Sequence, residues 1–194
     1  KVRDYDAELK ALSDKARREF SESILTQAKA LQGLINDMLD ATRLERGTIK
    51  LVEQDMDAAE IVEMALNACK AQAETMRISV LASLGEGIEI FGDVARIKQA
   101  VTNVIANAVK FSSEGGIVHV DMQKGPSGAL HIEVRDAGVG IAQEDLERLF
   151  EPFSQADDSM TRRFSGLGLG LVIARKIMRL HDGELLLASA EGAG

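Results

Sequence analysis

Asparagine and lysine side chains with the spacing of one helix face stand out in the segment NVIANAVKF, residues 103–111. Asn103, Asn107 and Lys110 fall at positions i, i+4 and i+7, so in a helix they project from nearly one face. Two amide oxygens and an ammonium group there can hold a hard cation and the phosphates that the cation neutralises. For a single asparagine an ordinary exposed polar face is the better explanation, but the pair followed by Ala-x-Lys-Phe favours a binding site.

Two glycine-rich segments further along the chain can bring the backbone against the same ligand. The first is DAGVG (136–140), which follows an apolar stretch, and the second is SGLGLGL (165–171), which opens a helical pattern. Glycines permit sharp turns and close approach, and N–H groups at a helix N-terminus favour anionic oxygens. DxGxG alone is a weak signal, because many strand-to-loop turns contain Asp and Gly. Together the three segments predict a nucleotide site.

This combination of motifs resembles the ATP-binding domain of sensor histidine kinases, part of a superfamily shared with gyrase, Hsp90 and MutL. The resemblance implies that Asn107 is the Mg²⁺ ligand and that Asn103 lies beside it near the phosphates. It also implies that Lys110 contacts a phosphate and that Phe111 packs near the adenine.

The resemblance assigns base recognition to the DAGVG segment. The Asp136 carboxylate can accept a hydrogen bond from the adenine 6-amino group, which guanine replaces with a carbonyl. Gly138 and Gly140 would let the backbone, with Ile141 behind them, turn sharply against the base.

The segment LFEPF (149–153) matches the phenylalanine box of histidine kinases. In this interpretation Phe150 and Phe153 pin the base of a mobile lid over ATP. The alternative is that the two aromatic side chains anchor a loop to the core. Arg162 and Arg163, in the polar loop that follows, are candidates for contact with the γ-phosphate. A solvated charge pair explains these two arginines equally well.

The final helix opens on a run of alternating glycine and leucine whose backbone N–H groups suit phosphate oxygens: Gly166, Leu167, Gly168, Leu169 and Gly170. The family often has threonine at position 167, so one hydroxyl contact is missing here. The leucine side chains themselves are expected to point into the core.

Residues 14–46 predict one long helix, ended by Gly47 as the residue after the cap. Its apolar residues alternate steps of four and three, the seam of a helical bundle: Ile24, Ala28, Leu31, Ile35, Met38 and Thr42. Residues 34–47 look like the end of the second helix of a dimerisation and phosphotransfer hairpin. The partner expected for the seam is a second copy of the chain, with packing onto the chain's own globular domain as the alternative.

The pattern predicts an α+β fold, an α/β sandwich in which one mixed sheet is covered on one face by helices. We expect residues 1–47 to be a partial dimerisation hairpin and residues 48–194 to be the ATP-binding catalytic domain. The predicted strands are 48–54, 77–83, 87–92, 116–124, 129–137 and 183–190. The predicted helices of the second domain follow an Asp57–Glu60 capping box, run from Asp93 to about 112, and cover 143–149 and 169–181.

The phosphoacceptor histidine of the family has no counterpart here. The three histidines, His119, His131 and His181, are expected to be structural or surface residues. We expect residues 1–13 to be the remainder of the first hairpin helix and the turn, so that the chain starts downstream of that histidine, and one more strand to follow residue 194.

Composition excludes several other classes of protein. The net charge of −8 argues against a nucleic-acid-binding surface, and the lone Cys69, expected to be buried, excludes a cysteine metal cluster. No apolar stretch is long enough to cross a bilayer, and the N-terminus does not resemble a signal peptide. We expect a cytoplasmic location, either as a free protein or as the cytoplasmic part of a membrane-anchored sensor.

The function predicted is that of the catalytic portion of a sensor histidine kinase. It would bind Mg-ATP, pass the γ-phosphate to a histidine on the dimerisation helix and then to the aspartate of a response regulator. The alternatives are a pseudokinase scaffold that signals by conformation, and another ATPase of the superfamily. Hydrolytic members carry a glutamate on the asparagine helix, and neither Gln99 nor Asn103 supplies one.

Overall fold

The computed structural model describes residues 2–125, 128–152, 154 and 168–190, with the backbone alone for residues 2–14, 30 and 45. The chain divides into two compact units, Lys1–Leu39 and Asp40–Gly194. The second unit begins inside the first helix, before the predicted boundary at residue 48.

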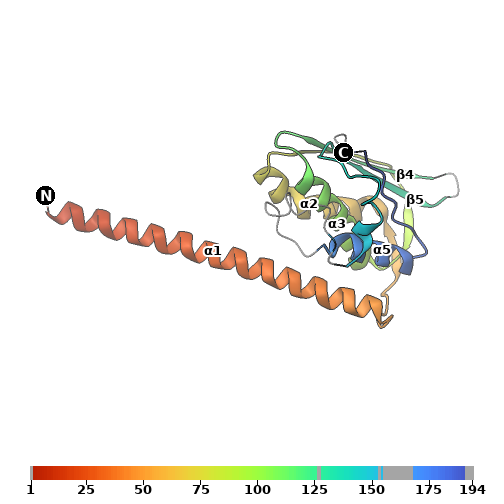
Figure 1. The fold of residues 1–194 in the computed structure, drawn as a ribbon, viewed down its shortest axis with the longest axis horizontal. Coiled ribbons are helices and arrows are strands. Elements are labelled where there is room, and N and C mark those ends of the chain that lie inside the picture. Colours follow the sequence, from red (N-terminus) through yellow and green to blue (C-terminus); the bar gives the residue numbers. More distant parts are fainter. Residues whose placement is uncertain (1, 126–127, 153, 155–167, 191–194) are drawn as a thin grey trace. The chain divides into compact units, whose positions relative to one another are not determined.

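Helix α1 (Val2–Glu45) is a single uninterrupted helix (Figure 1). The turn expected within residues 1–13 is therefore wrong, and the sequence of that segment holds neither glycine nor proline to break a helix. The large apolar residues of the seam are more than half exposed: Ile24, Leu31, Ile35 and Met38. Within the described ranges, no helix is both long and apolar enough to cross a membrane.

Helix α1 ends at the predicted glycine. Gly47 has a φ of +61°, a conformation that costs glycine least. The Thr48 N–H donates to the Arg43 carbonyl at 3.2 Å and the Gly47 N–H to the Leu44 carbonyl at 3.4 Å. This pair of bonds is the Schellman motif, and it fixes the direction in which the chain leaves the helix.

The strands form two sheets. β1 (Gln54–Asp57) and β3 (Glu89–Gly92) pair antiparallel. β2 (Ser79–Leu84), β4 (Ile117–Lys124) and β5 (Leu130–Arg135) form a sheet in the order β2-β4-β5. β2 and β4 run parallel, whereas β4 and β5 form an antiparallel hairpin, so this sheet is mixed as predicted.

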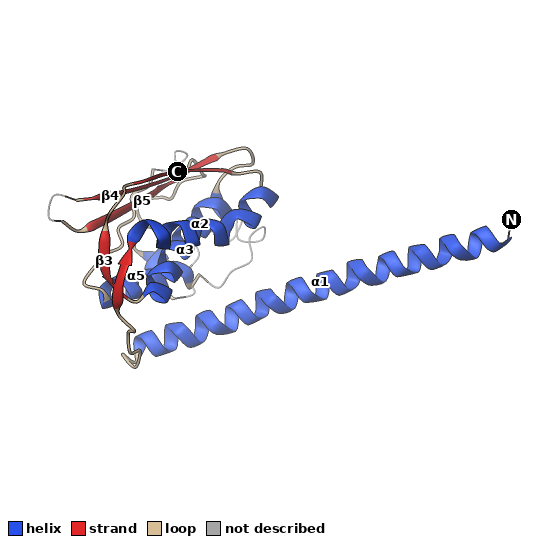
Figure 2. Cartoon of the chain, turned by 180° about the vertical axis from the view of Figure 1, so that it is seen from behind, coloured by secondary structure: helices blue, strands red, loops and turns tan. Residues whose placement is uncertain are grey.

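Helices cover one face of the mixed sheet (Figure 2). They are α2 (Ala58–Thr75), α3 (Val94–Phe111) and α5 (Gly170–Leu180). Val118, Val120 and Met122 of β4 are buried on the helix side, while His119 and Asp121 alternate with them on the outer side. The predicted α/β sandwich is confirmed. The main core consists of residues from α2, α3 and the sheet, including Ile61, Val62, Ile105, Val109, Val118 and Val120.

Three predicted elements differ from the structure. The strand expected over 48–54 lies at Gln54–Asp57, where pairing with Glu89–Gly92 decides its position. The structure assigns no strand to 183–190, although exposure alternates along 185–190, because an alternating pattern describes burial and supplies no hydrogen-bonding partner. The helix expected over 143–149 is a series of turns followed by one 3₁₀ turn, η1 (Arg148–Phe150).

Two smaller predictions hold within the second unit. Asp57 is the N-cap of α2, as predicted, although its carboxylate accepts the Ala59 N–H at 2.8 Å and not the Glu60 N–H that a capping box would use. Cys69 is a buried free thiol, and burial raises its pKa.

Candidate functional site

Helix α3 carries Asn103, Asn107 and Lys110, and its first turn is fixed by Asp93. The buried Asp93 carboxylate accepts the Arg96 N–H at 3.1 Å and the Val52 N–H at 2.9 Å. Burial alone would raise the pKa of Asp93, but these backbone donors and the nearby Arg96 charge lower it overall. The start of the helix is therefore held by a carboxylate that favours its ionised form.

The opposite faces of α3 differ as the sequence predicts. Its apolar face is buried in the core and consists mainly of Ile97, Val101, Ile105, Ala108 and Val109. Asn103, Asn107 and Lys110 are half-buried, at the border between core and solvent. The side chains expected to bind a ligand thus project from the packed helix without being enclosed by the core.

The two asparagines have different surroundings. Asn103 Nδ2 donates to the carbonyl of Gly170, the first residue of α5, at 3.1 Å. This bond ties the middle of α3 to the N-terminus of α5. Within the described part of the chain no protein group holds the Asn107 amide, so its oxygen remains suited to an external cation.

Lys110 and Phe111 lie together at the C-terminal end of α3. The Lys110 Nζ lies 4.9 Å from the centroid of the Phe111 ring, within cation–π range. Burial lowers the pKa of the Lys110 ammonium group. The Phe111 ring is 40% exposed, which leaves an aromatic surface beside the polar face of the helix.

The DAGVG segment packs directly on this end of α3. Asp136 Oδ1 accepts the Gly138 N–H at 2.9 Å, which forms an Asx turn. A Cβ on Gly138 would lie 2.6 Å from the Phe111 carbonyl oxygen, so only glycine fits this close approach. The fold therefore brings the predicted base-binding segment and the predicted phosphate-binding helix together.

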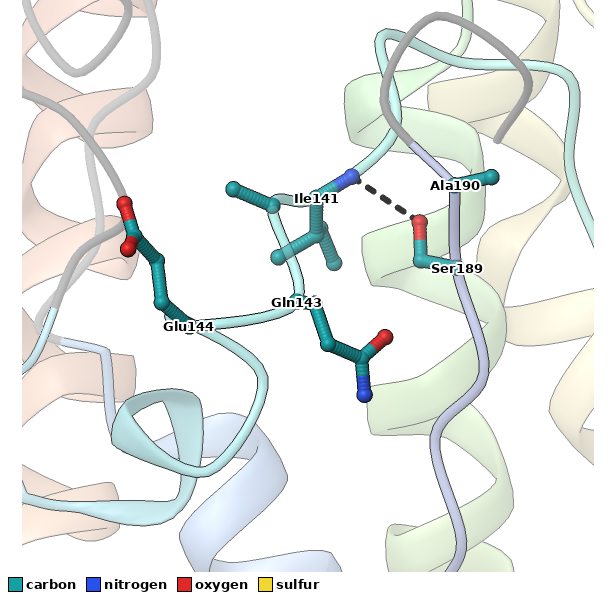
Figure 3. A pocket seen from close by; sticks show the side chains of 6 residues that line it. Ile141, Gln143, Glu144, Ser189 and Ala190 are labelled. Carbon is teal, nitrogen blue, oxygen red and sulfur yellow. Dashed lines mark hydrogen bonds between the residues drawn. The ribbon is translucent and has the colours of Figure 1, made fainter.

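The backbone beyond Asp136 continues past Gly140, whose φ is +70°, to Ile141. The Ile141 N–H donates to Ser189 Oγ at 2.9 Å, and these two residues border an open hollow of about 600 Å³ (Figure 3). The rest of its wall consists of Ala142, Gln143, Glu144 and Ala190. Ile141, a predicted base-binding residue, lies on its wall, whereas none of the α3 side chains line it, so the hollow is distinct from the polar face of α3.

The phenylalanine box is anchored by a residue that the motifs did not indicate. Phe150 is buried, and the guanidinium carbon of Arg175 lies 3.9 Å from its ring centroid. Gly168, with a φ of +67°, leaves no room for a Cβ against the Ser154 carbonyl. Leu169 is buried in the core, as expected for the leucines of this run. Among the other predicted site residues, Phe153, Arg162, Arg163, Gly166 and Leu167 lie outside the described residues.

The histidines lie where a structural or surface role was expected. His119 and His131 are exposed on the outer face of β4 and β5. His181 Nε2 accepts the Asp93 N–H at 3.0 Å while its Nδ1 contacts the Ile177 carbonyl at 2.8 Å. This arrangement requires the Nδ1–H tautomer and links the end of α5 to the start of α3.

Comparison with known proteins agrees with the fold and the motifs. A family model described as "Histidine kinase-, DNA gyrase B-, and HSP90-like ATPase" matches residues 92–194. This is more than half of the chain, and the chain belongs to this family. Its relatives identify the domain more narrowly as the ATP-binding domain of a sensor histidine kinase.

The curated relatives are longer proteins. Histidine protein kinase DivJ of Caulobacter vibrioides is 39% identical over 177 residues, which cover 91% of this chain and 29% of DivJ. Sensor histidine kinase GacS of Pseudomonas protegens is 33% identical over 181 residues, which cover 91% of this chain and 20% of GacS. The chain therefore spans less than a third of either relative.

Solved structures of histidine kinases share the fold. The Acinetobacter baumannii histidine kinase AdeS aligns with a TM-score of 0.66 and 25% identity. The alignment covers 81% of this chain and 71% of the AdeS chain. Full-length ShkA, solved in complex with AMPPNP, aligns with a TM-score of 0.67 and 28% identity. The alignment covers 77% of this chain and 31% of the ShkA chain.

Proposed function

We propose that this chain binds Mg-ATP on the polar face of α3, between the DAGVG segment and the N-terminus of α5. The observation that carries the proposal is the packing of Gly138 against the Phe111 carbonyl, which joins the base-binding and phosphate-binding motifs. The family match and the AMPPNP bound to full-length ShkA support the same ligand class.

The donor set fits magnesium with phosphate. Mg²⁺ prefers oxygen ligands and commonly takes only one or two from protein, with water and phosphate supplying the rest. The Asn107 amide oxygen is the protein ligand in this proposal, and the Lys110 ammonium contacts a phosphate. Bound Mg²⁺ would supply charge neutralisation at the phosphates.

Adenine recognition follows from how Asp136 is held. Its Oδ1 is engaged in the Asx turn with Gly138, which fixes the carboxylate relative to the loop. Oδ2 is then the oxygen that accepts from the adenine amino group, and Phe111 offers its exposed face to the base. In this proposal the backbone of Gly140 and the residue Ile141, which follow the Asx turn in the chain, also border the base.

The reaction proposed for the complete protein is phosphoryl transfer from ATP to histidine. This chain would position the γ-phosphate with Lys110, Arg162, Arg163 and the backbone N–H groups of residues 166–170. The histidine lies on a dimerisation helix, and an aspartate of a response regulator receives the phosphoryl group from it. The seam of α1 supplies the homodimer contact, and the segment contacts neither nucleic acid nor membrane.

The experiment is a nucleotide titration followed by calorimetry. The chain should bind ATP in the presence of Mg²⁺, bind it more weakly when Mg²⁺ is chelated, and prefer it to GTP. Absence of ATP binding by the folded chain at millimolar nucleotide would contradict the proposal.

A further inference from the structure

Three polar side chains join the end of α1 to the first turns of α3, and the proposed function leaves them without a role. Asp40 Oδ2 accepts hydrogen bonds from Arg96 Nη1 at 2.9 Å and from Gln99 Nε2 at 2.8 Å. Arg96 Nη1 also donates to Gln99 Oε1 at 2.9 Å. The Arg96 and Asp40 side chains are only 23% and 17% exposed, so solvent screens this pair less than a surface ion pair.

Apolar contacts hold the same end of α1. Ala41 and Leu44 pack against a small core cluster contributed mainly by α3 and α5: Ala100, Leu169, Ile173, Ala174 and Ile177. The Schellman motif at Gly47 then ends the helix immediately beyond these contacts. The last turns of α1 are therefore fixed by charge, hydrogen bonding and burial at once.

The polar cluster is continuous with the nucleotide residues of α3. Arg96, Gln99, Asn103 and Asn107 are spaced by three, four and four residues, so they follow one another along one helix face. Asn103 Nδ2 in turn holds the Gly170 carbonyl at the start of α5. The end of α1 thus contacts both helices that carry the proposed phosphate-binding groups. Because protein interiors are closely packed, a displacement of the end of α1 would also displace these two helices.

We propose that Asp40 is a positioning residue through which the end of α1 and the Mg-ATP site are energetically coupled. The proposal rests on the proposed function, because Mg-ATP is the ligand. Removing the Asp40 carboxylate leaves the half-buried Arg96 guanidinium without that charged acceptor, while its bond to Gln99 Oε1 remains, and α3 must shift or rehydrate there. Coupling between two sites is reciprocal, so Mg-ATP must also stabilise the end of α1.

The first measurement is Mg-ATP affinity of the whole 194-residue chain by calorimetry, for wild type, Asp40→Ala and Asp40→Glu. We expect Asp40→Ala to weaken binding about five- to tenfold and Asp40→Glu to recover part of the loss. Two controls accompany them. Asp121→Asn breaks the Arg135–Asp121 ion pair on the outer sheet face, and Ala73→Gly lowers stability in α2 away from the cluster. Neither control should change the affinity.

The second measurement is amide hydrogen exchange over residues 40–45 with and without Mg-ATP. Nucleotide should slow exchange there in wild type and have no effect in Asp40→Ala. Should Asp40→Ala fail to fold, Asp40→Asn, which keeps one acceptor oxygen, should show a smaller loss in both measurements.

The outcomes separate the two proposals. If wild type binds no Mg-ATP, the proposed function and this coupling both fall. If wild type binds and either Asp40→Ala keeps full affinity or Ala73→Gly weakens binding equally, only the coupling is overturned. Unchanged exchange over 40–45 on Mg-ATP binding to wild type would overturn it as well.

Discussion

Residues of the same type have different roles in this site because their surroundings differ. Asn103 and Asn107 are one helical turn apart, yet Asn103 is held by the Gly170 carbonyl whereas no described protein group holds Asn107. Spacing places both on one face, but only the structure shows that one serves the fold and the other remains suited to a cation.

A substitution of Asp136 can test base selectivity without removing the Asx turn, because the two carboxylate oxygens have different roles in the proposal. Asp136→Asn keeps an oxygen to accept the Gly138 N–H but replaces the second oxygen with an NH₂ donor. We expect ADP affinity to fall by about 1.5–3 kcal/mol, the contribution of a hydrogen bond to a charged group. The preference for ADP over GDP should shrink accordingly.

Calorimetric titration of wild type and Asp136→Asn with ADP and GDP measures both effects. Glu133→Gln, on the outer face of β5, is the matched control for loss of one acidic charge. Full ADP-over-GDP discrimination in folded Asp136→Asn would show that other groups recognise adenine.

Several site contacts could not be predicted from sequence because their partners are distant in the chain. Asp40 meets Arg96, Phe150 meets Arg175, and Asp93 meets His181 only after the sheet and helices pack. No local spacing indicates such pairs. In contrast, Asn103, Asn107 and Lys110 were predictable because helix geometry alone brings them together.

At the scale of elements, the start of α3 depends on one carboxylate. Asp93 caps the helix, holds the Val52 N–H and lies beside His181, so it connects three segments. Its pKa is lowered in the folded state despite burial, because backbone donors and Arg96 favour the ionised form. A lowered folded-state pKa contributes stability above the unfolded pKa, and this stability disappears as pH falls through the folded value.

The prediction for Asp93 concerns the pH dependence of the free energy of unfolding. Asp93→Asn should cost about 1–2 kcal/mol at neutral pH, as expected for loss of a helix cap and its partners. The variant should also lose stability less steeply than wild type as pH falls below about 4, the usual aspartate pKa. Urea unfolding between neutral and acidic pH tests this, and parallel curves for the two proteins would contradict it.

The ranges of helices and strands were predictable where a long segment has one clear hydrophobic period. Helices α3 and α5 and the β4–β5 hairpin lie close to their predicted ranges because their periodicity and bounding residues are local signals. β1 and the segment 183–190 were mispredicted because a strand needs a partner, and the register of that partner is not encoded locally.

At the scale of the whole molecule, the prediction concerns the partner that we expect for the α1 seam. Leu31 and Ile35 are 59% and 51% exposed in the single chain, among other seam residues of similar exposure. Such a stripe in water favours association with a second copy in a helical bundle. We therefore expect a concentration-dependent homodimer that Leu31→Glu and Ile35→Glu both weaken.

Light scattering over a range of protein concentrations measures this association. Lys29→Glu introduces the same residue at an already charged position of α1 and should leave the dimer in place. A monomer at every concentration, insensitive to all three substitutions, would contradict the dimer prediction.

The histidines give a second prediction at this scale. Exposed His119 and His131 are fixed on sheet strands, and His181 is engaged with Asp93, so none is available as a mobile phosphoacceptor. We expect the 194-residue chain to bind ATP without forming phosphohistidine. Mass spectrometry after incubation with Mg-ATP checks this, and stoichiometric phosphate on any of the three would contradict it.

The central claim is that α3 holds Mg-ATP through the Asn107 amide oxygen, and Asn107→Ala tests it most directly. Because Mg²⁺ tolerates little distortion of its oxygen ligands, losing one should weaken Mg-ATP binding markedly, by about 2 kcal/mol or more. Asn67→Ala, an exposed asparagine on α2, is the matched control and should bind as wild type does. Calorimetry on the two folded variants should show a large loss of Mg-ATP affinity for Asn107→Ala alone. Unchanged Mg-ATP affinity in folded Asn107→Ala would show that Asn107 is not a ligand and would contradict the site proposed around it.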